Sequence, residues 1–167
     1  VFDEVTSLPI QSALVTVKDV HNDVEPIFLI TDDKGFYSTP LRENMEYFIK
    51  AQKKGYFASA GNAATKGLTE TTHLEKDFFL AKIPSGDIII EGIEYDLNKS
   101  TLRPKSMEIL NKLVDMMVLN DNLSIEINSH TDTRGSDVYN LKLSQARAQS
   151  CVNYLISKGI KSERLKP

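Results

Sequence analysis

The chain has 167 residues, of which 41% are hydrophobic, so it is long enough for one large or two small domains with buried cores. Its 23 acidic and 20 basic residues nearly balance, so no broad basic face is implied, which argues against nucleic acid as a partner. The single cysteine excludes an intramolecular disulfide, and the three histidines stand too far apart for a local metal-ligand spacing. We therefore predict no metal and no cofactor.

No apolar run approaches the roughly 20 residues that a helix needs to cross a bilayer, so we predict no membrane-spanning segment in this sequence. The sequence begins without a methionine or a signal segment and stops at Lys166-Pro167, which we interpret as a fragment of a longer protein. Any targeting signal of that protein is then expected outside these residues.

Up to about residue 82, the sequence consists of short runs rich in β-branched and aromatic residues, and such runs predict strands. The runs are residues 13–17, 27–30, 47–50 and 74–80. Between the second and third runs lie aspartates that can cap their own backbone and Gly35, which can adopt positive φ, so we predict a tight hairpin at residues 31–37. Strands at this spacing, with no helical period among them, predict a small antiparallel sandwich.

Four segments of this half are shared with a known module: residues 3–10 (DEVTSLPI), 13–17 (ALVTV), 31–37 (TDDKGFY) and 54–56 (KGY). In them the sequence resembles the carboxypeptidase regulatory-like domain. The resemblance implies an Ig-like, all-β sandwich that is not catalytic and that acts as a spacer or docking module.

Proline and glycine interrupt the regular pattern at residues 83–86, which predicts a linker. We place the β-sandwich domain at residues 1–82 and a second domain at residues 87–167.

The second domain contains hydrophobic patterns of two kinds, one typical of strands and one typical of helices. Residues 88–95, which include three consecutive isoleucines, predict a strand, and the alternation of apolar and polar side chains over residues 123–127 predicts another. From Pro104, apolar residues recur every three or four positions and predict a helix of about four turns. A second helical period runs through residues 148–155 to Gly159, a suitable left-handed C-cap. The order strand, helix, strand, helix predicts an α/β domain.

A dense motif follows the second predicted strand. It reads His130-Thr131-Asp132, Gly135-Ser136, Asn140, Leu143-Ser144 and Arg147-Ala148. At these spacings the segment resembles the OmpA-like C-terminal domain, and the resemblance extends over about residues 87–165. Members of that family usually continue into another strand and a final helix, so we predict a truncated OmpA-like fold.

This second resemblance implies a site for peptidoglycan. Family members hold the stem peptide by its diaminopimelic acid, one end of which carries both an ammonium and a carboxylate. By resemblance, Asp132 accepts from the ammonium and Arg147 binds the carboxylate, in agreement with the bidentate match between a guanidinium and a carboxylate. The resemblance also assigns ligand contacts to Asn98, Thr131 and Asn140.

Two local features favour a joint site for these charges. Asp132 follows the end of a predicted strand, and Ser144, three residues before Arg147, is a good N-cap for a helix. A helix that starts there brings the positive end of its dipole close to the ligand carboxylate. We therefore expect Asp132 and Arg147 to lie close together.

We predict a non-catalytic protein of the periplasm, associated with the outer membrane and with peptidoglycan, that anchors an outer-membrane protein or an envelope or secretion assembly to the cell wall. Other outer-membrane or secretion-complex proteins are expected as further partners. Two alternatives stay open: a protein–protein adaptor with a vestigial pocket, and a wall-processing enzyme. The enzyme needs a nucleophile or a metal beside Asp132, and the sequence offers neither at a convincing spacing.

Overall fold

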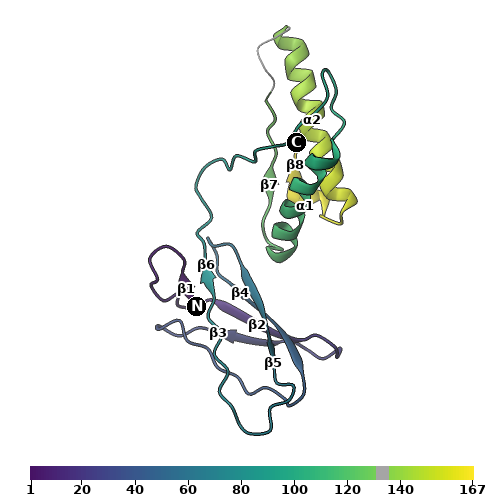
Figure 1. The fold of residues 1–167 in the computed structure, drawn as a ribbon. Helices are drawn as coiled ribbons and strands as arrows, with labels where there is room; N and C mark the ends of the chain where they lie inside the picture. Colours follow the sequence, from purple (N-terminus) through teal and green to yellow (C-terminus); the bar gives the residue numbers. More distant parts are fainter. Residues whose placement is uncertain (131–135) are drawn as a thin grey trace. The chain divides into compact units, whose positions relative to one another are not determined.

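The computed structural model describes residues 1–130 and 136–167 and separates into two compact units, Val1–Asp87 and Ile88–Pro167 (Figure 1). The division falls just after the linker predicted at residues 83–86. Each unit has a hydrophobic core of its own. Among the described residues, no helix is long and apolar enough to cross a bilayer.

The N-terminal unit consists mainly of strands, which lie in two sheets. The larger sheet is antiparallel and contains, in spatial order, β3 (Ile27–Ile30), β2 (Leu14–Asp19), β4 (Glu46–Gln52) and β5 (Ser59–Ala64). The smaller sheet pairs β1 (Phe2–Asp3) in parallel with β6 (Phe79–Leu80). This strand-rich unit fits the predicted β-sandwich.

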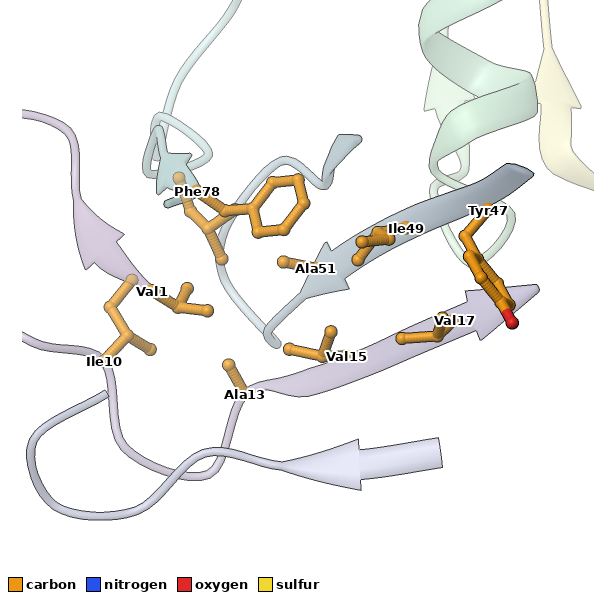
Figure 2. Packing of buried hydrophobic residues seen from close by; sticks show 10 residues of the cluster. Val1, Ile10, Ala13, Val15, Val17, Tyr47, Ile49, Ala51 and Phe78 are labelled. Atoms are coloured by element: carbon orange, nitrogen blue, oxygen red, sulfur yellow. The ribbon is translucent and has the colours of Figure 1, made fainter. Parts of the chain in front are cut away.

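Buried and more exposed side chains alternate along β2 and β4, and the buried ones form the core of this unit (Figure 2). Val15 and Val17 of β2 are buried, and so are their ladder partners on β4, Ala51 and Ile49. Phe78, just before β6, belongs to the same buried cluster. Each large apolar side chain removed from water in this way contributes about 1.5–3 kcal/mol, so the shared face holds the sheet and β6 together.

The prediction of a turn at residues 31–37 is right, but the predicted hairpin is wrong. The Asp32 carboxylate accepts backbone hydrogen bonds from Lys34 (2.9 Å) and Phe36 (2.8 Å), and Gly35 has a φ of 70°. However, β3 and β4 are not neighbours, because β2 lies between them and pairs with both. After the turn, the chain therefore passes β2, so that β4 pairs with the edge of β2 opposite to β3.

Two further strand predictions for this unit need correction. The strand expected over residues 74–80 is confined to β6, Phe79–Leu80. No strand was predicted at Ser59–Ala64, whose sequence SAGNAA has few side chains with a preference for strands. β5 forms there because its backbone completes a ladder with β4, a pairing that the local sequence does not encode.

The described part of the C-terminal unit contains two α-helices, one 3-10 helix and a small parallel sheet. Its elements are α1 (Pro104–Leu119), β7 (Ile125–Glu126), α2 (Asp137–Ser157), the 3-10 helix η1 (Ser162–Arg164) and β8 (Leu165–Lys166). α1 packs against α2, and β7 pairs with β8. The predicted start of α1 at Pro104 is confirmed, as is the helix end at Gly159, which has a φ of 92° and donates its N–H to the Ile156 carbonyl.

The strand predicted at residues 88–95 does not form. Ile88 and Ile89 are exposed, and the only pairing recorded for this stretch of the described chain is an isolated bridge between Tyr95 and Leu102. No described strand pairs with these residues, so their backbone forms no ladder. Instead, the buried hydroxyl of Ser106 in α1 accepts from the N–H of Glu94 (2.8 Å) and donates to its carbonyl (2.9 Å).

The start of α2 also differs from the prediction. The helix begins at Asp137, and its N-cap is Ser136, whose hydroxyl accepts from the N–H of Tyr139 at 3.3 Å. Ser144 lies inside the helix, where its hydroxyl donates to the Leu141 carbonyl (2.9 Å). The prediction that Ser144 caps the helix is therefore wrong.

Candidate ligand-binding site

Arg147 lies at the midpoint of α2, and its guanidinium is held from two sides. The central carbon Cζ lies 4.7 Å from the centroid of the Tyr95 ring, within the range of a cation–π contact. The Nε–H donates to the backbone carbonyl of Lys99 at 3.1 Å. Among the described residues, no partner is recorded for the terminal nitrogens Nη1 and Nη2. Within that part of the chain, both nitrogens are therefore open to an anion.

The helix dipole has no part in this arrangement. Arg147 stands several turns beyond the first residue of α2, Asp137, whereas the effect of the dipole is confined to the first turn. The expected reinforcement of Arg147 by a helix N-terminus is therefore wrong, and the ring and the carbonyl account for its placement.

Tyr95 is anchored beneath Arg147 by its own hydroxyl. The hydroxyl donates to the backbone carbonyl of Arg147 (3.2 Å) and lies 3.1 Å from the Sγ of Cys151, one turn further along α2. Burial raises the pKa of Tyr95, and the bond to Cys151 acts in the same direction. Burial also raises the pKa of the Cys151 thiol. Both groups therefore stay neutral near pH 7 and serve as hydrogen-bonding parts of the packing.

The loop between Tyr95 and Leu102 brings Asn98 to the same place. The bridge between Tyr95 and Leu102 closes the loop, and the N–H of Lys99 donates to the Asp96 carbonyl at 3.0 Å. Asn98 is exposed and has a φ of 58°, a left-handed conformation that asparagine tolerates better than most residues. Because the next residue holds the Nε–H of Arg147, the structure places the Asn98 loop beside Arg147.

An ion pair ties down the ends of this loop. Arg103, just before α1, donates from Nε (2.9 Å) and Nη2 (2.7 Å) to one oxygen of Asp96, and its Nη1 lies 3.3 Å from Glu94. The hydrogen bonds from Arg103 lower the pKa of Asp96 below its usual value, and the same bonds raise the pKa of Arg103. The loop that carries Asn98 and the Lys99 carbonyl is thus closed by charge as well as by backbone pairing.

Asn140 reaches the site from α2 itself. It precedes Arg147 by seven residues, which is about two helical turns, so both side chains lie on one face of the helix, roughly 10 Å apart along its axis. The Asn140 side chain is partly buried, and its backbone N–H donates to the Ser136 carbonyl at 2.9 Å. Arg147, Asn140 and the Asn98 loop therefore share one side of α2.

The remaining two predicted site residues, Asp132 and Thr131, lie outside the described residues. The expected proximity of Asp132 to Arg147 stays a prediction. Among the described residues, no three histidine, cysteine, aspartate or glutamate side chains gather in a way that could hold a metal ion.

Three contributors to the site were missed from the sequence: Tyr95, the carbonyl of Lys99 and the pair formed by Asp96 and Arg103. Tyr95 was assigned to a strand, and its contact with Arg147, 52 residues away, has no local signature. The signal that could have found the ion pair is a pair of opposite charges around a short polar loop. A backbone carbonyl leaves no such signal, because every residue has one.

Residues 95–167 match the model of the OmpA family. Over 73 residues the chain is 42% identical to outer membrane protein A of Serratia marcescens and 44% identical to outer membrane protein A of Salmonella typhi. These alignments cover 42% of this chain but only 20% and 21% of the two relatives. The chain therefore corresponds to a minor part of the length of these relatives.

The chain also matches a photosystem protein and a solved structure. The chain is 34% identical over 91 residues to the photosystem I P700 chlorophyll a apoprotein A2 of Gloeobacter violaceus, which covers 53% of this chain and 10% of that protein. Among solved structures, the OmpA-like domain of FopA1 from Francisella tularensis superposes with a TM-score of 0.41 and 26% identity, over 44% of this chain and 51% of that chain.

Proposed function

We propose, from the OmpA family domain at residues 95–167, that this chain binds the peptidoglycan stem peptide through the zwitterionic end of diaminopimelic acid. OmpA-like domains generally bind peptidoglycan and are generally not catalytic. The proposal adds to this general activity a chemical target and a site.

The observation that carries the proposal is that the guanidinium of Arg147 is held in place while its two terminal nitrogens are open in the described part of the chain. Its guanidinium is fixed by Tyr95 and by the Lys99 carbonyl, while the described residues offer no partner to Nη1 and Nη2. A planar guanidinium with two open donor groups matches a carboxylate in a bidentate geometry better than any other side chain does. In the proposal, Arg147 binds the carboxylate of diaminopimelic acid.

The ammonium of the same ligand requires an anion, and we assign this role to Asp132. Thr131, Asn98 and Asn140 supply hydrogen bonds that orient the stem peptide. The placement of Asn98 and Asn140 on the Arg147 side of α2 supports this assignment, because a stem peptide that lies along this side can meet all three residues.

For the cellular role, we propose that the chain tethers an outer-membrane protein or an envelope or secretion assembly to the cell wall from the periplasmic side. Residues 1–82 then act as a non-catalytic spacer or docking module of the carboxypeptidase regulatory-like type. The strand-rich N-terminal unit, with a core separate from that of the binding domain, supports a spacer role. The two relatives named outer membrane protein A support the envelope location.

The test is a calorimetric titration of the chain with two muropeptides that differ at one position, one with diaminopimelic acid and one with lysine, which lacks the second carboxylate. The wild-type chain is expected to bind the first and to bind the second about tenfold to a hundredfold more weakly, because one charge-assisted contact contributes about 1.5–3 kcal/mol. Arg147→Ala is expected to weaken binding of the first by a similar factor. Lys142→Ala, an exposed charge change on the same helix, serves as the matched control.

Equal affinity of wild type and Arg147→Ala for the diaminopimelate muropeptide refutes the site. The same incubation separates the two alternatives. Absence of binding by the wild type points to an adaptor with a vestigial pocket, whereas new cleavage products in a chromatogram point to a wall-processing enzyme.

A further inference from the structure

We infer that Tyr95 is a positioning residue, which together with the Lys99 carbonyl presents Arg147 so that a ligand carboxylate docks end-on, through Nη1 and Nη2. This inference rests on the proposed function, because it concerns how that site meets its carboxylate. It adds a residue that makes no ligand contact of its own and a direction of approach.

The N–H donors of Arg147 that remain open determine the direction from which a carboxylate can approach. A guanidinium has five N–H donors in one plane, one on Nε and two on each terminal nitrogen. A carboxylate can meet two of them side-on, through Nε and one terminal nitrogen, or end-on, through both terminal nitrogens. The Lys99 carbonyl occupies the Nε–H at 3.1 Å, and the Tyr95 ring covers one face at 4.7 Å. Only the end-on edge of Arg147 keeps both of its donor groups open among the described residues.

The prior ordering of the Arg147 side chain affects the affinity for the ligand through conformational entropy. An arginine side chain carries about 2 kcal/mol of rotamer entropy, part of which is lost when a ligand fixes it. Because Tyr95 and the Lys99 carbonyl already hold the guanidinium of Arg147, less freedom remains to be lost on binding. Removal of the ring should therefore weaken binding without removing any ligand contact.

The ring of Tyr95 can act in this way because it is itself fixed. Its hydroxyl lies between the Arg147 carbonyl at 3.2 Å and the Cys151 Sγ at 3.1 Å, and its backbone pairs with Leu102. One hydroxyl can accept from the thiol while it donates to the carbonyl, so both contacts form together. The Tyr95 ring is therefore held in place against α2.

The affinity test uses the full chain and the diaminopimelate muropeptide. Tyr95→Leu is expected to weaken binding about threefold to tenfold, the range of a partly exposed cation–π contact. Tyr95→Phe restores the ring without the hydroxyl and is expected to recover most of the lost affinity. Tyr154→Leu is the matched control. Tyr154 packs against the same core, and its ring lies beneath the Lys158 ammonium at 5.3 Å, so its loss tests destabilisation alone.

A second readout needs no ligand. In wild type, the Nε–H of Arg147 should exchange with water at least tenfold more slowly than that of the exposed Arg42, because it donates to the Lys99 carbonyl while the guanidinium packs on the Tyr95 ring. In Tyr95→Leu the difference should disappear, and in Tyr95→Phe it should persist. Nitrogen-15 NMR of the arginine side chains measures both rates.

The outcomes separate the two proposals. Equal muropeptide affinity of wild type and Tyr95→Leu, or a weakening by Tyr154→Leu as large as that by Tyr95→Leu, overturns the positioning role. If the wild type binds no muropeptide, the proposed function fails, and the exchange rate of the Arg147 Nε–H alone decides whether Tyr95 and Lys99 hold the guanidinium. If Tyr95→Leu does not fold, fast exchange of the same proton in wild type still refutes the inference.

Discussion

The buried carboxylate of Asp3 organises the first turn of the N-terminal unit. It accepts hydrogen bonds from the N–H groups of Thr6 (2.9 Å) and Val5 (3.1 Å) and from the hydroxyl of Tyr56 (3.1 Å), and Lys82 lies 3.4 Å away. The bond from the Thr6 backbone is the main reason that the pKa of Asp3 lies well below its usual value, while burial opposes the shift. The ionised form is therefore the one that the fold stabilises.

This environment predicts how the N-terminal unit responds to acid. Because the folded pKa of Asp3 is depressed, its contribution to stability is complete above the unfolded value of about 4 and is lost as the pH falls toward the folded value. Asp3→Asn should lower the melting temperature at pH 7 and flatten its fall between about pH 4 and pH 2. Thermal unfolding at a series of pH values measures this.

The control for this experiment is Asp33→Asn, which neutralises an exposed aspartate in the turn at residues 31–37. It should leave the acid slope unchanged. An acid slope in Asp3→Asn as steep as in wild type would contradict the role of Asp3.

At the scale of elements, Arg164 links the end of the chain to the end of α1. Its Nε donates to the Leu123 carbonyl (2.7 Å), and its Nη2 donates to the carbonyls of Met117 (2.9 Å) and Asn120 (2.6 Å). The last carbonyls of a helix have no partner within the helix, and they attract a positive charge. Arg164 in η1 thus closes α1 from a distance of more than 40 residues along the chain.

We predict that Arg164→Ala lowers the free energy of unfolding of the C-terminal unit by about 2–4 kcal/mol. The reason is that three carbonyls lose a charged donor, each such bond contributing about 1.5–3 kcal/mol without full additivity. Urea denaturation followed by circular dichroism measures the change. Lys161→Ala, an exposed cation just before η1, should change the free energy by less than about 0.5 kcal/mol.

Elements with a strong local signal were predicted from the sequence, and elements that depend on a distant partner without such a signal were not. Pro104 and the apolar stripe after it define α1, and Gly159 ends α2, because each signal acts within one or two turns. In contrast, the isoleucines at residues 88–90 favour a strand that has no neighbour to pair with, and the small residues of β5 form a strand because β4 offers an edge. Strand pairing is the non-local part of the fold.

At the scale of the whole molecule, the chain carries two separate hydrophobic cores. The core of Val1–Asp87 includes Val15 and Leu80, and the core of Ile88–Pro167 includes Met117 and Leu155. Each core gathers side chains from its own unit alone. A change in one core is therefore expected to destabilise one unit.

We predict that Gly35→Ala and Arg164→Ala destabilise different units. Gly35 has a φ of 70°, and a Cβ there would collide with the Val1 carbonyl oxygen, so alanine should cost the N-terminal unit about 1–3 kcal/mol. Hydrogen exchange with mass spectrometry should show faster exchange only in peptides from residues 1–87 for Gly35→Ala, and only in peptides from residues 88–167 for Arg164→Ala. Faster exchange in both units of either variant would contradict separate cores.

The site shows the same limit of sequence-based prediction as the fold. The resemblance to the OmpA-like domain predicted ligand contacts for Arg147 and Asn140; both residues lie on one side of α2, and their role stays a prediction. The expected contribution of a helix N-terminus beside Arg147 was wrong, because it assumed a helix start at Ser144. The residues that do hold Arg147, Tyr95 and the Lys99 carbonyl, belong to a loop that the Asp96 and Arg103 ion pair closes.

The partner that Lys99 offers to Arg147 belongs to the main chain, whereas its ammonium lies 3.6 Å from Asp96. Replacement of the side chain cannot delete that oxygen, so the contact with Arg147 does not depend on which side chain stands at position 99. An alanine scan of the loop would score residue 99 as silent although it takes part in the site. Homologues can therefore differ freely in identity here while they keep the same course of the backbone.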